Sequence, residues 1–80
     1  MQIPIPPGET VKDLMKTKRI GFLEMSERLE ISLEDLKSLL NGFNRIDENL
    51  ASKLEEILGP SQSFWLRLEA IFREKLTKMS

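Results

Sequence analysis

The stretch GFLEMSERLEISLEDLKSLLNG, residues 21–42, predicts two short helices joined by the tight turn "EIS". In the first helix, Phe22, Met25 and Leu29 are spaced at i, i+3 and i+7 and share one apolar face. Four leucines of the second helix are predicted to point inward: Leu33, Leu36, Leu39 and Leu40. Each helix has only about eight or nine residues, which is too few for a helix to be stable alone. The pair therefore predicts a helix-turn-helix unit that depends on a larger core.

Both ends of the second helix carry start and stop signals. Ser32 is a favoured N-cap residue, and Asp35 stands at capping-box spacing from it. Asn41-Gly42 supplies a left-handed stop. Glu34 and Asp35 lie at the positive end of the helix dipole, where each charge contributes roughly 0.3 to 1 kcal/mol. That effect accounts for the two acidic residues without any ligand.

The N-terminal segment predicts an extended arm followed by a helix. Residues 1–7 alternate isoleucine with proline, which disfavours a helix, and Gly8 is expected to end the arm. Thr10 and Asp13 have capping-box spacing, so a helix is expected from Thr10 to about Lys18.

Two further helices are predicted after the helix-turn-helix unit. Asp47 can cap the first of them, which ends at Gly59-Pro60. Ser61 or Ser63 begins the second, a long amphipathic helix over residues 61–80.

The elements add up to one all-α domain of five helices over residues 1–80. No segment alternates apolar and polar residues over four or more positions as a half-buried strand does. One core is expected, made of these residues: Leu14, Met25, Leu29, Leu36, Leu40, Leu54, Ile57, Trp65 and Leu68.

The composition is that of an ordinary soluble domain, with 40% apolar and 31% charged residues. The chain has no cysteine, histidine or tyrosine, and no carboxylates isolated on an apolar face. We therefore expect no enzymatic activity, metal, cofactor or small-molecule substrate. The sequence has no run of about 18 apolar residues and no signal-peptide pattern, which predicts a cytoplasmic protein outside the membrane. The net charge of −1 leaves only a local basic patch for nucleic acid.

Four stretches carry a resemblance to a known family: PGETVKDL at 7–14, LLNG at 39–42, RIDENLASKLEEILG at 45–59 and SFWLRLEA at 63–70. Through them the chain resembles the lambda-repressor-like (XRE) helix-turn-helix domains, and among these the HigA-type antitoxins of toxin-antitoxin modules. The resemblance implies a five-helix lambda-repressor-like fold and a transcriptional regulator that binds double-stranded operator DNA as a homodimer. It also implies a RelE-like toxin that the chain neutralises.

The same resemblance implies which residues face DNA. They lie on the second helix of the unit and directly after it: Ser32, Leu33, Glu34, Lys37, Ser38, Asn41, Asn44 and Arg45. Glu34 can accept a hydrogen bond from a cytosine amino group in the major groove. Arg45 is expected to contact phosphate.

Two residues depart from the pattern of the family. Phe22 stands where such domains usually have glutamine, and Glu30 stands where the turn usually has glycine. A non-glycine residue at positive φ costs about 1 kcal/mol. Together with Glu34 and Asp35, these departures leave an alternative open, in which the same fold does not read DNA and acts as a protein-protein interaction module.

An apolar stripe on the C-terminal helix is expected to form a homodimer interface: Leu68, Ile71, Phe72, Leu76 and Met79. The stripe extends beyond what the other four helices can cover. Two alternatives remain, namely contact with the Ile3-Pro4-Ile5 arm of the same chain and contact with a toxin.

Overall fold

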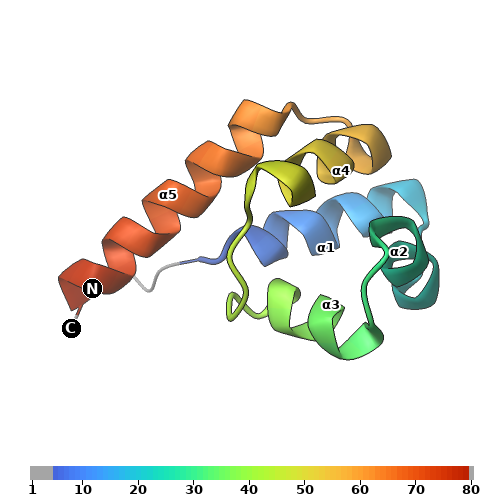
Figure 1. Cartoon of the computed structure of the whole chain (residues 1–80), viewed down its shortest axis with the longest axis horizontal. Coiled ribbons are helices and arrows are strands. Elements are labelled where there is room, and N and C mark those ends of the chain that lie inside the picture. Colours follow the sequence, from blue (N-terminus) through green and yellow to red (C-terminus); the bar gives the residue numbers. More distant parts are fainter. Residues whose placement is uncertain (1–4, 80) are drawn as a thin grey trace.

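Five helices follow one another along the chain (Figure 1). The computed structural model describes residues 5–79, with side chains for residues 5–78. The helices are α1 (Pro7–Lys18), α2 (Phe22–Leu29), α3 (Leu33–Leu40), α4 (Glu48–Leu58) and α5 (Gln62–Met79). No strand occurs between residues 5 and 79, so the predicted all-α fold is confirmed. Among the described residues, no helix has the length and apolar character needed to cross a membrane.

Helix α1 begins earlier than the sequence predicted. Pro6 is the N-cap, with φ −68° and ψ 152°, and Pro7 takes the first helical position. A proline is favoured there because the missing N–H has no partner within the helix. The prediction of a start at Thr10 is therefore wrong, and the predicted arm over residues 1–7 is wrong at Pro7. Residues 1–4 of that arm lie outside the described residues.

Gly8 lies inside α1 and does not end an arm. The residue is buried, and a β-carbon added to it would lie 2.3 Å from the carbonyl oxygen of Leu40 in α3. The absence of a side chain therefore allows the backbones of α1 and α3 to touch. This crossing places α1 between α3 and α4 (Figure 1).

The turn between α2 and α3 is tight although it contains no glycine. Glu30 follows α2 in the left-handed region, with φ 59° and ψ 41°, and its N–H donates to the Glu27 carbonyl at 3.1 Å. Lys53 of α4 supports the turn, because its Nζ donates to the Leu29 carbonyl at 3.2 Å. The chain thus accommodates the strain that the sequence predicted for a non-glycine residue at this position.

Helix α3 has the predicted limits. The Ser32 Oγ accepts a hydrogen bond of 3.0 Å from the Asp35 N–H, which is the N-cap interaction. At the other end, Gly42 has φ 83° and the Phe43 N–H donates to the Ser38 carbonyl at 2.8 Å. Both signals read from the sequence are therefore present in the structure.

A single apolar core joins the five helices. Its buried members are Val11, Met15, Met25, Leu29, Leu36, Leu39, Leu40, Ile46, Ala51, Leu54, Leu58 and Trp65. The indole Nε1 of Trp65 donates to the Pro60 carbonyl at 3.1 Å, which satisfies its one polar atom. Three residues predicted to be in the core are only partly buried and pack against it: Leu14, Ile57 and Leu68.

Leu33 does not point into the core as predicted, because 42% of its surface is exposed. Helical side chains lean toward the N-terminus, so a side chain in the first turn projects past the end of its helix. Leu33 is in that position at the start of α3.

Helices α4 and α5 also begin at capping residues. The Asp47 Oδ1 accepts a hydrogen bond of 2.8 Å from the Leu50 N–H, and the Ser61 Oγ accepts one of 3.2 Å from the Phe64 N–H. Gly59, with φ 111°, separates the two helices. Helix α5 packs on α4 and α1, and its C-terminal turns extend past them (Figure 1).

Candidate nucleic-acid interface

Helix α3 presents a polar face at the edge of the molecule. Leu36, Leu39 and Leu40 attach it to the core, and the residues between them face outward. Five of the predicted DNA-facing residues are exposed on this helix or its cap: Ser32, Leu33, Glu34, Lys37 and Asn41. Ser38 is half-buried. The structure therefore brings these six residues together on one short helix.

Ser32 is the N-cap of α3. Its hydroxyl oxygen already accepts the Asp35 N–H, so the residue fixes the first turn of α3. The carboxylates of Glu34 and Asp35 lie in that first turn and are exposed. Their position favours negative charge through the helix dipole, while their charge opposes approach of a phosphate.

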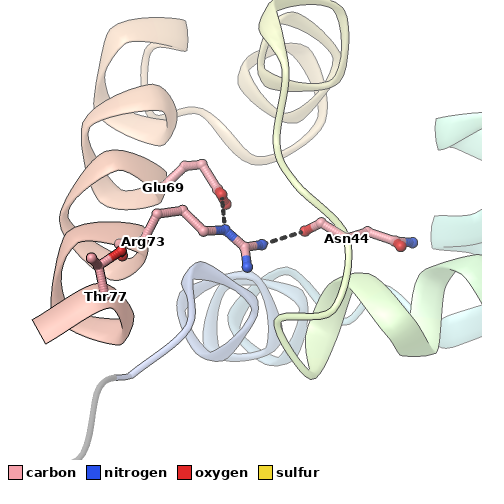
Figure 2. A network of polar contacts seen from close by, with 4 residues as sticks. All are labelled: Asn44, Glu69, Arg73 and Thr77. Carbon is pink, nitrogen blue, oxygen red and sulfur yellow. Dashed lines mark hydrogen bonds and ion pairs between the residues drawn. The ribbon is translucent and has the colours of Figure 1, made fainter. Parts of the chain in front are cut away.

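Asn44 is bound on two sides within the chain. Its side-chain Nδ2 donates to the main-chain carbonyl of Asp35 in α3 at 3.2 Å. Its main-chain carbonyl accepts from Arg73 Nη2 of α5, also at 3.2 Å. Figure 2 shows Asn44 between α5 and α3. The sequence predicted Asn44 as a DNA contact, whereas the structure gives its amide nitrogen an internal partner.

Arg45 follows Asn44 and is exposed. It forms no ion pair with any residue in the described part of the chain. Its guanidinium is therefore available to an external anion, and a phosphate group suits its fork of N–H donors.

The charges around α3 are mixed in sign. On α2, Arg28 is 2.8 Å from the Glu24 carboxylate and is neutralised by it. Three basic residues at the end of α1 are exposed and lack an ion pair within residues 5–78: Lys16, Lys18 and Arg19. Positive charge that could face phosphate therefore lies mainly outside α3, in Arg45 and at this end of α1.

Large apolar side chains are exposed near the same elements. Phe22 and Leu23 begin α2 with 58% and 62% of their surfaces exposed, and Phe43 after α3 is 80% exposed. The sequence assigned Phe22 to an apolar face of its helix. The structure leaves it exposed in the first turn of α2, whose buried residues are Met25, Ser26 and Leu29.

The apolar stripe predicted on α5 divides into two parts. Phe72 is buried and Leu68 is half-buried, whereas Ile71 and Leu76 are 42% and 39% exposed. The side chain of Met79 lies outside the described residues. A groove beside the exposed part runs between α5 and the start of α1, and is lined by Ile5, Pro6, Pro7, Thr10, Leu68, Ile71, Phe72 and Lys75.

Metal ligands do not gather in the described part of the chain. Groups of three or more acidic, histidine or cysteine side chains able to hold a metal are absent from it. Among the described residues, the groove beside α5 is lined mostly by apolar side chains, with Lys75 as the one charged residue. Its chemistry is that of a contact surface.

Two solved structures are similar to this chain over nearly its whole length. One is an addiction module antidote protein of the HigA family from Coxiella burnetii, with 26% identity over 94% of this chain and 83% of that chain, and a TM-score of 0.80. The other is a putative antidote protein of a plasmid maintenance system from Nostoc punctiforme PCC 73102, with 26% identity over 98% and 86% of the two chains, and a TM-score of 0.85. No family model and no curated protein matches the sequence. The predicted resemblance to HigA-type antitoxins is confirmed by these two structures.

Proposed function

We propose that this chain is the antitoxin of a toxin-antitoxin module, and that it binds operator DNA as a homodimer and neutralises a RelE-like toxin. The observation that carries the proposal is the exposed polar face of α3, displayed after a tight turn in a fold shared with two antidote proteins. Both activities would take place in the cytoplasm, and neither needs a cofactor.

DNA reading is assigned to α3 inserted in the major groove. Lys37 can donate to guanine, Asn41 can bond adenine with both atoms of its amide, and Glu34 can accept from a cytosine amino group. Leu33 is an apolar partner for a thymine methyl group. These four side chains are exposed together, and Ser32 orients the helix turn that carries two of them.

Phosphate contacts are assigned to residues outside the helix. Arg45 is the main candidate because it is exposed and free of internal ion pairs in the described chain. Lys16 and Arg19, at the end of α1, extend the positive rim. With the acids on α3 the cationic surface of one chain is modest, and a dimer doubles the phosphate contacts, so we expect binding to weaken with salt in proportion to their number.

The homodimer is needed because one short helix reads too few bases for specificity. We assign the dimer contact to the exposed part of the α5 stripe, with Ile71 and Leu76 at its centre and the half-buried Leu68 at its edge. Phe72 packs beneath this surface, because it is buried in the single chain.

A second candidate function is supported by the apolar residues near α3. Phe22, Leu23, Leu33 and Phe43 are exposed, and the first turn of α3 is acidic. Exposed apolar groups of this kind are typical of protein contacts. In this alternative, the same surface binds a protein and does not read DNA.

Two measurements separate the candidates. The first is a gel shift at low salt with the DNA upstream of the chain's own gene, which a DNA-binding antitoxin retards. The second is co-expression with the reading frame adjacent to that gene, in which an antitoxin restores growth arrested by a toxin. Rescue without any gel shift supports the protein-binding alternative, and failure of both removes the proposal.

A further inference from the structure

A line of polar contacts joins α5 to the first turn of α3, and Figure 2 shows its part from Glu69 through Arg73 to Asn44. The Glu69 Oε2 accepts a hydrogen bond from Arg73 Nε, one turn along α5. Arg73 Nη2 then donates to the carbonyl of Asn44, and Asn44 Nδ2 donates to the carbonyl of Asp35, each at 3.2 Å. Four residues are thereby connected, of which the first and the last, Asp35 and Arg73, are 38 positions apart in the sequence.

Glu69 is the fixed end of this line. Only 10% of its side chain is exposed, and Oε1 is buried with no hydrogen-bond partner among the described residues. Arg73 is consequently the ion-pair partner on which this buried carboxylate depends. The guanidinium also lies 5.0 Å from the centre of the Phe72 ring, which limits its movement further.

Asn44 is the point where the line meets the loop between α3 and α4. The Phe43 N–H donates to the Ser38 carbonyl, but within the described residues Asn44, Arg45 and Ile46 form no hydrogen bond between main-chain groups. The loop is held instead by the buried side chain of Ile46 and by the two bonds of Asn44. Arg45 lies between these two anchors and has its own side chain exposed.

We infer that Arg73 is a positioning residue for the DNA contact, because it holds Asn44 and thereby sets both Arg45 and the first turn of α3. The inference rests on the proposed function for its DNA part. Arginine suits this role because Nε and Nη2 bind two different acceptors at once from one rigid plane. Lysine has the same charge, but its donors share one nitrogen at the end of a flexible stem, so it does not fix the two acceptors in this geometry.

The test compares Arg73→Lys and Arg73→Met with Lys78→Met in the full chain. Lys78 is a matched control because it also pairs with a carboxylate one turn away on α5, Glu74 at 3.1 Å, but is 73% exposed and not joined to the loop. Affinity for the upstream duplex is measured well below the unfolding transition of each variant. We expect both Arg73 variants to bind about tenfold more weakly, while Lys78→Met stays close to the wild type. Equal losses in Arg73→Met and Lys78→Met would overturn the inference, because they would reflect net charge alone.

A double substitution shows whether Arg73 acts through Arg45. If it does, Arg45→Ala combined with Arg73→Lys loses less affinity than the product of the two single losses, and Arg45→Ala lowers the salt slope by about 1.8 for the two phosphate contacts of a dimer. Losses that multiply in the double variant would contradict the inference.

A measurement without DNA keeps the inference separate from the proposed function. Amide NMR shifts of Arg73→Lys should change at Asn44 and Arg45, and also at Leu36, whose N–H belongs to the same peptide group as the Asp35 carbonyl. Changes confined to α5 would overturn the positioning role even if the wild type binds DNA. Changes that reach α3 in a protein that binds no duplex would support the positioning role and remove the proposed function.

Discussion

Gly8 of α1 lies directly against Leu40 of α3: a β-carbon at Gly8 would be 2.3 Å from the Leu40 carbonyl oxygen and 2.4 Å from its Cα. Such a contact cannot be relieved by a side-chain rotation, because the neighbouring atoms belong to the backbone. The crossing of α1 over α3 therefore depends on this glycine, and with it the placement of α3, to which we assign DNA reading.

Gly8→Ala is expected to lower the free energy of unfolding by about 1 to 3 kcal/mol, since the helices must move apart. Gly21→Ala is the matched control, because nothing lies within 4 Å of a β-carbon there. Gly21→Ala weakens the N-cap of α2 and also makes the unfolded chain less flexible, and these two effects on the free energy of unfolding offset each other to within about 1 kcal/mol. Urea unfolding measures both, and equal effects of the two substitutions would contradict the close crossing.

Glu30→Gly should stabilise the fold. Glycine removes the cost of the left-handed conformation at φ 59°, and the expected gain is about 0.5 to 1 kcal/mol after the added flexibility of the unfolded chain. The ion pair with Lys53 is lost, but at 3.8 Å and with Glu30 77% exposed it contributes little. Glu27→Gly, within α2, should instead destabilise by about 1 kcal/mol. Thermal unfolding distinguishes the two, and a lower Tm for Glu30→Gly would argue against strain in this turn.

The cap of α3 predicts an asymmetry between two neighbouring residues. Ser32→Ala removes the oxygen that accepts the Asp35 N–H and should cost about 0.5 to 2 kcal/mol. Asp35→Ala keeps that N–H and loses only the interaction with the helix dipole, about 0.3 to 1 kcal/mol. Unfolding at low and high salt checks the difference, because only the Asp35 effect should shrink as salt rises. The opposite order would mean that the Asp35 carboxylate caps the helix.

Ile71→Glu should abolish the dimer. Ile71 is exposed on α5 at the centre of the assigned interface, where a carboxylate from each chain would lose its water within an apolar contact and face the same charge on the partner chain. Leu23→Glu introduces the same charge at an exposed apolar residue of α2 and should leave the dimer intact. Light scattering gives the mass directly, and a wild-type monomer at high micromolar concentration would remove the interface.

Much of the fold was predictable because its signals are local. Three helix starts are indicated by their capping residues, Ser32, Asp47 and Ser61, and the apolar spacing within each helix indicates its buried face. The start of α1 was not predictable, because the proline run that disfavours a helix interior also suits a helix start at Pro7.

The site was predictable only in outline. The exposed face of α3 follows from its inward leucines, but the internal bonds of Asn44 depend on contact with Arg73, 29 residues away. Glu69 gives no sign of burial in the sequence, because a glutamate on an amphipathic helix is ordinarily exposed. Such features arise from the packing of α5 against the loop and not from spacing along the chain.

Fluorescence anisotropy of a labelled duplex from upstream of the chain's own gene, titrated with wild-type protein over a range of salt, tests the central claim most directly. The account predicts binding at least about a thousandfold tighter than to a scrambled duplex, with affinity that falls steeply as salt rises. Binding to neither duplex at low salt would contradict DNA reading by α3, and its exposed face would then belong to a protein partner.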